Sequence, residues 1–148
     1  MSLAASMLVI LSGVGCADQE PPADAELARI ERRAEECLAL ARSEAWDSLA
    51  ACVLVERWQD AGWVQVRLED PSHPQRAELR ARALELFQRL YGGGKSPGGV
   101  HAVRMKMDDP DRKPPLPRAV VTYRHGDFDS FEMARVGETW HWVVTLWD

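Results

Sequence analysis

Residues 119–147, AVVTYRHGDFDSFEMARVGETWHWVVTLW, decide the fold of this chain. The dipeptides Gly126-Asp127 and Gly137-Glu138 divide this stretch into three apolar-rich segments. Two-residue turns of this composition favour tight hairpins, because glycine accepts a positive φ at little cost. The stretch therefore predicts three consecutive antiparallel strands, near residues 119–123, 128–136 and 139–147.

A fourth strand is predicted upstream, where Val103, Met105 and Met107 alternate with other residues. The segment from Asp108 to Pro117 is charged and rich in proline, which predicts a surface loop before the next strand. The C-terminal third is therefore expected to form an antiparallel four-stranded meander.

Helical periodicity precedes the meander. Apolar residues recur at spacings of three and four on one helical stripe, namely Leu27, Ile30, Ala34, Cys37, Leu38 and Ala41. A second pattern from Trp46 to Arg57 predicts a partner helix in a helical hairpin. The alternating segment Trp63 to Leu68 predicts a strand, although it could equally continue a helix. A third helix is expected from His73-Pro74 to the glycine run 92–94, which ends it.

The beginning of the chain predicts export. Residues 3–15 read LAASMLVILSGVG and carry no charge. This length suits the apolar region of a signal peptide and is too short to span a bilayer. Small residues, one cysteine and a polar continuation resemble a bacterial lipoprotein signal with its lipobox, here Gly13-Val14-Gly15-Cys16. The resemblance implies that Cys16 carries a lipid.

The leader departs from the lipoprotein pattern at two points. Gly13 stands where the family usually has leucine, and residues 2–6 offer no lysine or arginine. Ordinary secretion without a lipid and a buried N-terminal helix of a cytosolic protein are the alternatives. We expect a signal peptide over residues 1–15, a lipidated leash over 16–24 and one α+β domain over 25–148.

Two further cysteines, Cys37 and Cys52, would remain after lipidation. An even pair in an oxidising compartment favours a disulfide, and the alternative is two buried free thiols. Their geometry is open, because the bridge needs a suitable register between the two predicted helices.

Composition excludes some partners. The 148 residues include 18 Lys+Arg and 23 Asp+Glu, for a net charge near −5. Nucleic-acid binding depends on clustered lysine and arginine, so nucleic acid is not an expected partner.

The order of elements, together with the terminal Gly137-Glu138-Thr139-Trp140-His141-Trp142-Val143-Val144, resembles the cystatin-like cone fold of the SnoaL and ketosteroid-isomerase superfamily. The resemblance extends over about residues 25–148 and is mainly one of element order. It implies an α+β domain in which helices pack on a curved sheet and leave a conical pocket. Some members use this pocket for catalysis and others only for binding.

Catalytic members of the superfamily place an Asp base and acidic hydrogen-bond donors inside the cone. The resemblance offers four possible equivalents on predicted strands: Asp129, Tyr123, His101 and His141. No enzyme motif can be carried over residue by residue, so no catalytic residue is assigned. The side chains named as possible pocket lining are Tyr123, Trp140, Trp142 and His141, although tryptophans in such strands often only fill a core. The histidines are scattered and no cofactor or metal site is expected.

These features predict an envelope-tethered lipoprotein that faces the periplasm, with the outer membrane favoured because Ala17 follows the cysteine. Its domain is expected to bind a small apolar ligand or another envelope protein without catalysis. One alternative is an isomerase or dehydratase that uses the conical pocket. Another is a periplasmic immunity protein that binds a toxin.

Overall fold

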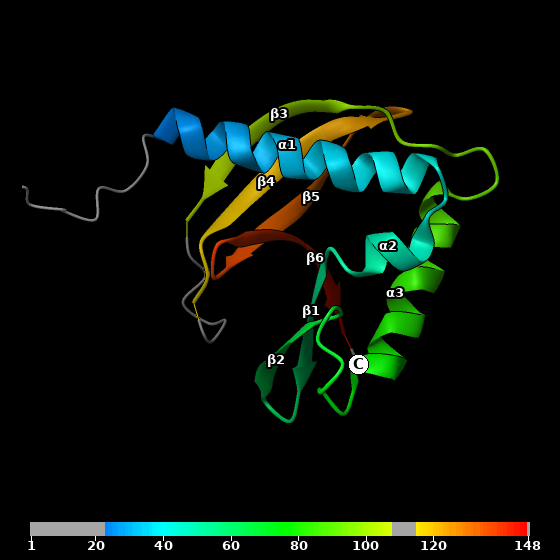
Figure 1. Cartoon of the computed structure of the whole chain (residues 1–148), viewed down its shortest axis with the longest axis vertical. Coiled ribbons are helices and arrows are strands. Elements are labelled where there is room, and N and C mark those ends of the chain that lie inside the picture. Colours follow the sequence, from blue (N-terminus) through cyan, green and yellow to red (C-terminus); the bar gives the residue numbers. More distant parts are fainter. Residues whose placement is uncertain (1–22, 108–114, 148) are drawn as a thin grey trace, which may run out of the picture.

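The computed structural model describes residues 23–107 and 115–147 (Figure 1). Its three helices are α1 (Ala23–Arg42), α2 (Trp46–Ala50) and α3 (Arg76–Tyr91). Its strands are β1 (Val53–Gln59), β2 (Gly62–Arg67), β3 (Val100–Lys106), β4 (Arg118–His125), β5 (Asp127–Val136) and β6 (Thr139–Leu146). The expected α+β class is confirmed.

Helix α1 follows the predicted apolar stripe. Its fully buried side chains include Ile30, Ala34, Cys37 and Leu38, at spacings that place them on one face. Asp24 lies in the first turn and Arg42 in the last, which suits the helix dipole at both ends. The helix begins at Ala23, so the last two residues assigned to the leash belong to it.

The predicted second helix is wrong beyond Ala50. Helix α2 ends there, and β1 occupies the segment from Val53 that the helical pattern had included. The run Val53-Leu54-Val55 is buried on both faces, and such strands read as continuous apolar runs without alternation. The spacing of Trp46, Leu49 and Val53 mimicked a helix for this reason.

One six-stranded sheet forms, in the order β2-β1-β6-β5-β4-β3, where a four-stranded C-terminal meander and a separate strand at residues 63–68 were expected. Strands β3 to β6 pair antiparallel in chain order, and β1 and β2 form an antiparallel hairpin. Strand β1 joins the two parts by pairing parallel to β6, with Val55 opposite Val144. The strand predicted at residues 63–68 is confirmed as β2.

Helix α3 begins at Arg76, two residues after the proline expected in its first turn. It ends at Tyr91 as predicted, but Gly92 is extended with φ −76°. The left-handed conformation falls instead on Gly93 and Gly94, with φ of 64° and 85°.

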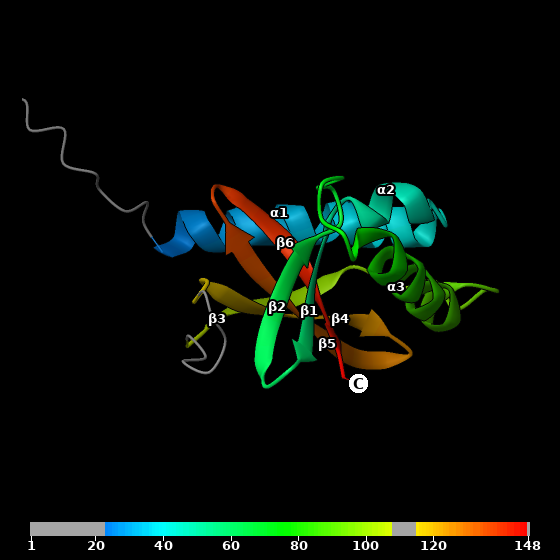
Figure 2. The ribbon, with the colours of Figure 1, turned by 90° about the horizontal axis from the view of Figure 1, so that it is seen from below.

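The two faces of the sheet differ. The helices cover one face, the inner face, and α1 packs against β3, β4 and β6 (Figures 1 and 2). A smaller buried cluster on the other face, the outer face, consists of Leu54, Ala134 and Val143. Leu116 and Val136 pack against this cluster, and no residue of a described helix belongs to it. Functional groups can therefore lie inside the helix-covered core or on the outer face.

Candidate functional site

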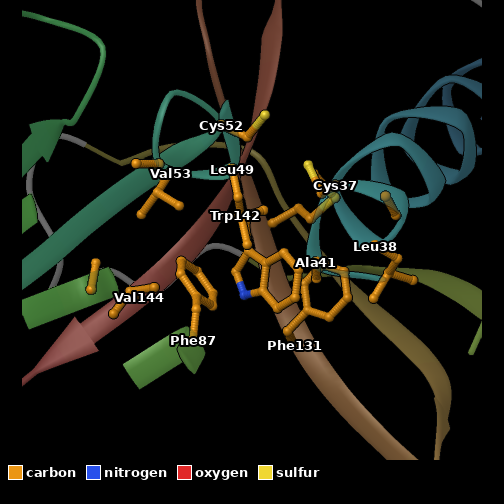
Figure 3. Close-up of a cluster of buried hydrophobic side chains, with 14 of the residues drawn as sticks. Cys37, Leu38, Ala41, Leu49, Cys52, Val53, Phe87, Phe131, Trp142 and Val144 are labelled. Atoms are coloured by element: carbon orange, nitrogen blue, oxygen red, sulfur yellow. The ribbon is translucent and has the colours of Figure 1, made fainter. Parts of the chain in front are cut away.

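Aromatic side chains fill the space between the helices and the sheet. Trp142 lies at the centre, with the ring of Phe131 stacked on it at 3.9 Å and that of Phe87 edge-on at 5.2 Å (Figure 3). The ring of Tyr91 completes the group, with its centroid 5.9 Å from that of Trp142. Trp142 is only 4% exposed, so this part of the predicted cone is packed core.

The four predicted pocket residues do not come together around a cavity. Tyr123, Trp140 and Trp142 lie on the inner face and are at most 4% exposed. His141 lies on the outer face, where Nε2 is 2.9 Å from Oε1 of Glu69. Trp140 does border a surface hollow of about 320 Å³, together with three arginines of α1: Arg29, Arg32 and Arg33.

Trp140 is held by a buried carboxylate that the sequence did not reveal. Its Nε1 donates a hydrogen bond of 2.8 Å to Oε1 of Glu26, which also forms a 3.2 Å ion pair with Arg135. The backbone oxygen of Trp140 accepts a bond of 3.1 Å from Nε of Arg33. These contacts attach the start of β6 to α1 and make Trp140 a structural residue.

Two of the proposed catalytic candidates do meet. The hydroxyls of Tyr91 and Tyr123 are 2.6 Å apart, and the Tyr123 hydroxyl donates a bond of 3.4 Å to Asp129. His125, which was not a candidate, stacks on Tyr123 and lies 3.9 Å from the same carboxylate. Burial raises the pKa of Tyr91 far above its usual value, and burial and the nearby Asp129 raise the pKa of Tyr123 to about 12. Both phenols therefore keep their protons at neutral pH, and the pair forms a hydrogen-bonded chain that ends at Asp129.

Access to the tyrosine pair is limited. Tyr91 and Tyr123 are 3% and 2% exposed, while the Asp129 side chain is 55% exposed at the edge of the cluster. Neither tyrosine lines the hollow beside Trp140 or the groove at Trp63. The remaining candidate, His101, lies on the outer face with its ring 4.4 Å from Phe128.

Cys37 and Cys52 lie side by side in the core, as thiols (Figure 3). The hydrogen bond between the two thiols and burial raise the pKa of Cys37, and the same bond lowers the pKa of Cys52. Sγ of Cys52 is in turn 3.6 Å from the backbone oxygen of Ser48. The pairing of these residues follows from the turn between α2 and β1, not from the helical hairpin expected.

A buried ion pair crosses the outer face. Arg118 binds both carboxylate oxygens of Glu56 at 2.6 and 2.7 Å, and its side chain and that of Glu56 are 1% and 0% exposed. Arg118 also binds Glu132 at 2.8 Å, and Gln65 donates a 2.8 Å bond to Glu56. Burial would lower the pKa of Arg118, but the two carboxylates outweigh it and raise this pKa. The network joins β1 to β4 across two intervening strands.

Three of the six tryptophans form a surface cluster, which we call the tryptophan cluster: Trp58, Trp63 and Trp147. Trp58 and Trp63 are cross-strand partners in the β1–β2 hairpin, with ring centroids 5.4 Å apart. Trp147 meets Trp63 at 5.0 Å, and Trp58 and Trp147 remain 40% and 65% exposed. A groove of about 410 Å³, with an apolar wall that includes Leu54, begins at Trp63.

Among the described residues, no group of three or more His, Cys, Asp or Glu side chains is arranged to hold a metal ion. None of the helices in residues 23–107 and 115–147 is long and apolar enough to cross a membrane.

The similarity of this chain to known proteins is weak. No protein-family model matches the sequence, and no curated protein matches it. Among solved structures, the chain is similar to one described as an NTF2-like transpeptidase from Campylobacter jejuni, with 14% identity and a TM-score of 0.40. That match covers 78% of this chain and 97% of the other. The β subunit of the benzoate 1,2-dioxygenase from Burkholderia mallei is 15% identical, with a TM-score of 0.39, over 82% of this chain and 87% of its own. Likeness at this level assigns no function, and the chain stands as a mixed α+β protein with one six-stranded sheet.

Proposed function

We propose that this chain is a bacterial lipoprotein whose folded domain binds another envelope protein through its surface. In this proposal residues 1–15 are removed, Cys16 is acylated, and the domain faces the periplasm, with the outer membrane favoured. The observation that carries the binding role is the distribution of tryptophan. Trp142 fills the interior where a ligand pocket was expected, whereas Trp58 and Trp147 gather at the surface.

A surface tryptophan cluster suits a protein partner. Tryptophan is enriched at the centres of protein interfaces, because a large ring can be buried there at low cost in side-chain entropy. Trp147 leaves 65% of its surface exposed in this chain, so that area is available to a partner.

The position of the cluster favours a partner away from the anchoring membrane. Six residues, 17–22, would separate the lipidated cysteine from α1, and the seven steps from residue 16 to residue 23 span at most about 25 Å. The start of α1 and the β1–β2 hairpin lie on different sides of the molecule in both views (Figures 1 and 2). A leash of this length holds the start of α1 near the bilayer and leaves the tryptophan cluster accessible.

The proposal includes a disulfide between Cys37 and Cys52. The two side chains are buried neighbours in the core, and such proximity is what a disulfide requires. An oxidising periplasm would supply a disulfide donor that accepts the two thiol protons and two electrons and is itself reduced to a dithiol.

Intact mass of the native protein tests the anchoring. We expect a chain that begins at an acylated Cys16, and that gains the mass of two hydrogen atoms when it is reduced. The variant Cys16→Ala is the control, and it should lose the acyl mass while it keeps the change on reduction. A native chain that retains Met1 and an unmodified Cys16 would contradict the anchoring.

Photo-crosslinking tests the binding surface. A photoreactive amino acid at position 147 should give one discrete protein adduct in intact envelopes, and Trp58→Ala should weaken it. Leu90, which is 37% exposed on α3, is the matched control position and should give no such adduct. Equal adducts from positions 147 and 90 would contradict a specific surface.

The tyrosine pair, Tyr91 and Tyr123, favours a second candidate function, that of an acid–base enzyme of the isomerase or dehydratase type. Tyr123 and Asp129 would exchange a proton with a substrate, which requires that the packed core open to admit it. The only tyrosines of the chain are Tyr91 and Tyr123, so N-acetylimidazole, which acetylates accessible tyrosines, measures this opening directly. Modification at a rate near that of free tyrosine supports the enzyme, and complete protection contradicts it.

A further inference from the structure

A second surface, chemically unlike the tryptophan cluster, lies at the other end of the outer face. Strands β3, β4 and β5 form this end of the sheet (Figure 2). Their register places alternate residues on the face opposite α1. Four exposed residues define it, and we call it the basic sheet patch: His101, Arg104, Arg124 and Phe128.

Phe128 is the apolar centre of the patch. It is 55% exposed, although it lies within a strand. The ring of His101 packs against it at 4.4 Å, and the guanidinium carbon of Arg124 is 5.7 Å from its centroid. Three strands thus hold one exposed phenyl ring and a guanidinium in a fixed arrangement, which lowers the entropy cost of binding.

The charge of the patch is opposite to that of the whole chain. No ion pair joins Arg104 or Arg124 to a carboxylate of the described residues. Glu132, the carboxylate that β5 places on this face, is already bound by Lys106 and Arg118, each at 2.8 Å. The patch is therefore positive on a protein of net charge −5, which is suited to a negatively charged partner.

The spacing of the arginines indicates the shape of that partner. Arg104 is paired with Val120, and Arg124 lies four residues further along β4. At about 3.3 Å per residue the two positions are roughly 13 Å apart along the strand. Two carboxylates four residues apart in an extended peptide have the same separation.

We propose that the basic sheet patch binds an extended, acidic segment of a partner protein, with Phe128 covered by an apolar part of that segment. Nucleic acid fits less well, because two arginines that pair with no described carboxylate neutralise few of its closely spaced phosphates. This interaction is separate from that of the tryptophan cluster and does not depend on lipidation.

The test uses a fluorescent peptide that carries two Glu residues four positions apart with a Val midway between them, and Thr elsewhere. It is about ten residues long so that it crosses the patch at 3.3 Å per residue. Its binding to the chain that begins at residue 16, with Cys16→Ser, is measured by fluorescence anisotropy at low salt. We expect Arg104→Gln and Arg124→Gln each to weaken binding about threefold to fivefold. Phe128→Ala should weaken it about fivefold or more.

The control is Arg32→Gln, which removes the same charge from an exposed position on α1. It should change binding less than twofold, as should Trp147→Ala. Equal losses with Arg32→Gln and Arg124→Gln would overturn the proposal, and so would the absence of any binding. Tighter binding of duplex DNA than of the acidic peptide would also overturn it, in favour of a general polyanion site. Loss with Trp147→Ala alone would place the acidic segment at the tryptophan cluster.

Discussion

Replacing Arg118 with methionine should be among the most destabilising single changes on the outer face. The guanidinium makes three bonds of 2.6 to 2.8 Å to Glu56 and Glu132, and its side chain is 1% exposed. Methionine fills much of the same space but leaves the Glu56 carboxylate buried without its cation. Loss of one partner of a buried pair costs about 3–5 kcal/mol. For a chain of this size that corresponds to a fall in Tm of about 6–20 °C.

Urea unfolding measures this cost, provided that the m-value stays constant across the variants. The double variant Glu56→Met/Arg118→Met removes both charges and should be more stable than the sum of the single changes predicts, because the two groups touch. Lys106→Met is the matched control. Its ion pair with Glu132 is 38% and 20% exposed, so its loss should cost at most about 1 kcal/mol. If Arg118→Met costs no more than Lys106→Met, or if the single effects add in the double variant, the reasoning is wrong.

Three further changes test other parts of the structure. Tyr91 and Tyr123 have pKa values above the unfolded value of about 10, so stability should be intact below that pH and fall as pH rises toward 12, by up to about 1.4 kcal/mol per pH unit per tyrosine. Urea unfolding at a series of alkaline pH values checks this, and stability that is flat above pH 10 would count against it. Ala61→Gly should stabilise the chain by about 0.5–1 kcal/mol, because Ala61 has φ 62° in the β1–β2 turn and glycine adopts this left-handed conformation without strain. An unchanged urea midpoint would refute this. In oxidised protein, reduction of the proposed Cys37–Cys52 bond should cost roughly 3 kcal/mol, the value for closing a loop of about 15 residues. Alkylation of both thiols without prior reduction would show that no bond forms.

The sequence predicted the elements whose burial is one-sided. Ile30, Ala34 and Leu38 repeat at helical spacing because only one face of α1 is covered, and Val121 and Tyr123 alternate because only one face of β4 is. Strand β1 was not predicted, because Val53, Leu54 and Val55 are all buried and show no alternation of apolar and polar residues.

The site was harder to predict than the fold. Tyr123 and Asp129 were named and do meet, because they are register partners in one hairpin. Glu56 and Arg118 are 62 residues apart, and only the order of strands in the sheet brings them together. The basic sheet patch was likewise invisible in the composition, since register alone gathers its cations on one face of an acidic protein.

The parallel pairing of β1 with β6 also governs when the chain can fold. Residues 53–57 remain without one neighbour until residues 142–146 have been synthesised, because β6 lies between β1 and β5 in the sheet. A growing polypeptide thus lacks this inner strand of the sheet until residue 146 has been added. Pairing between strands so distant in the sequence is slow to form. The chain therefore stays unfolded during most of its synthesis, and an unfolded chain is the form that can pass through a translocation channel.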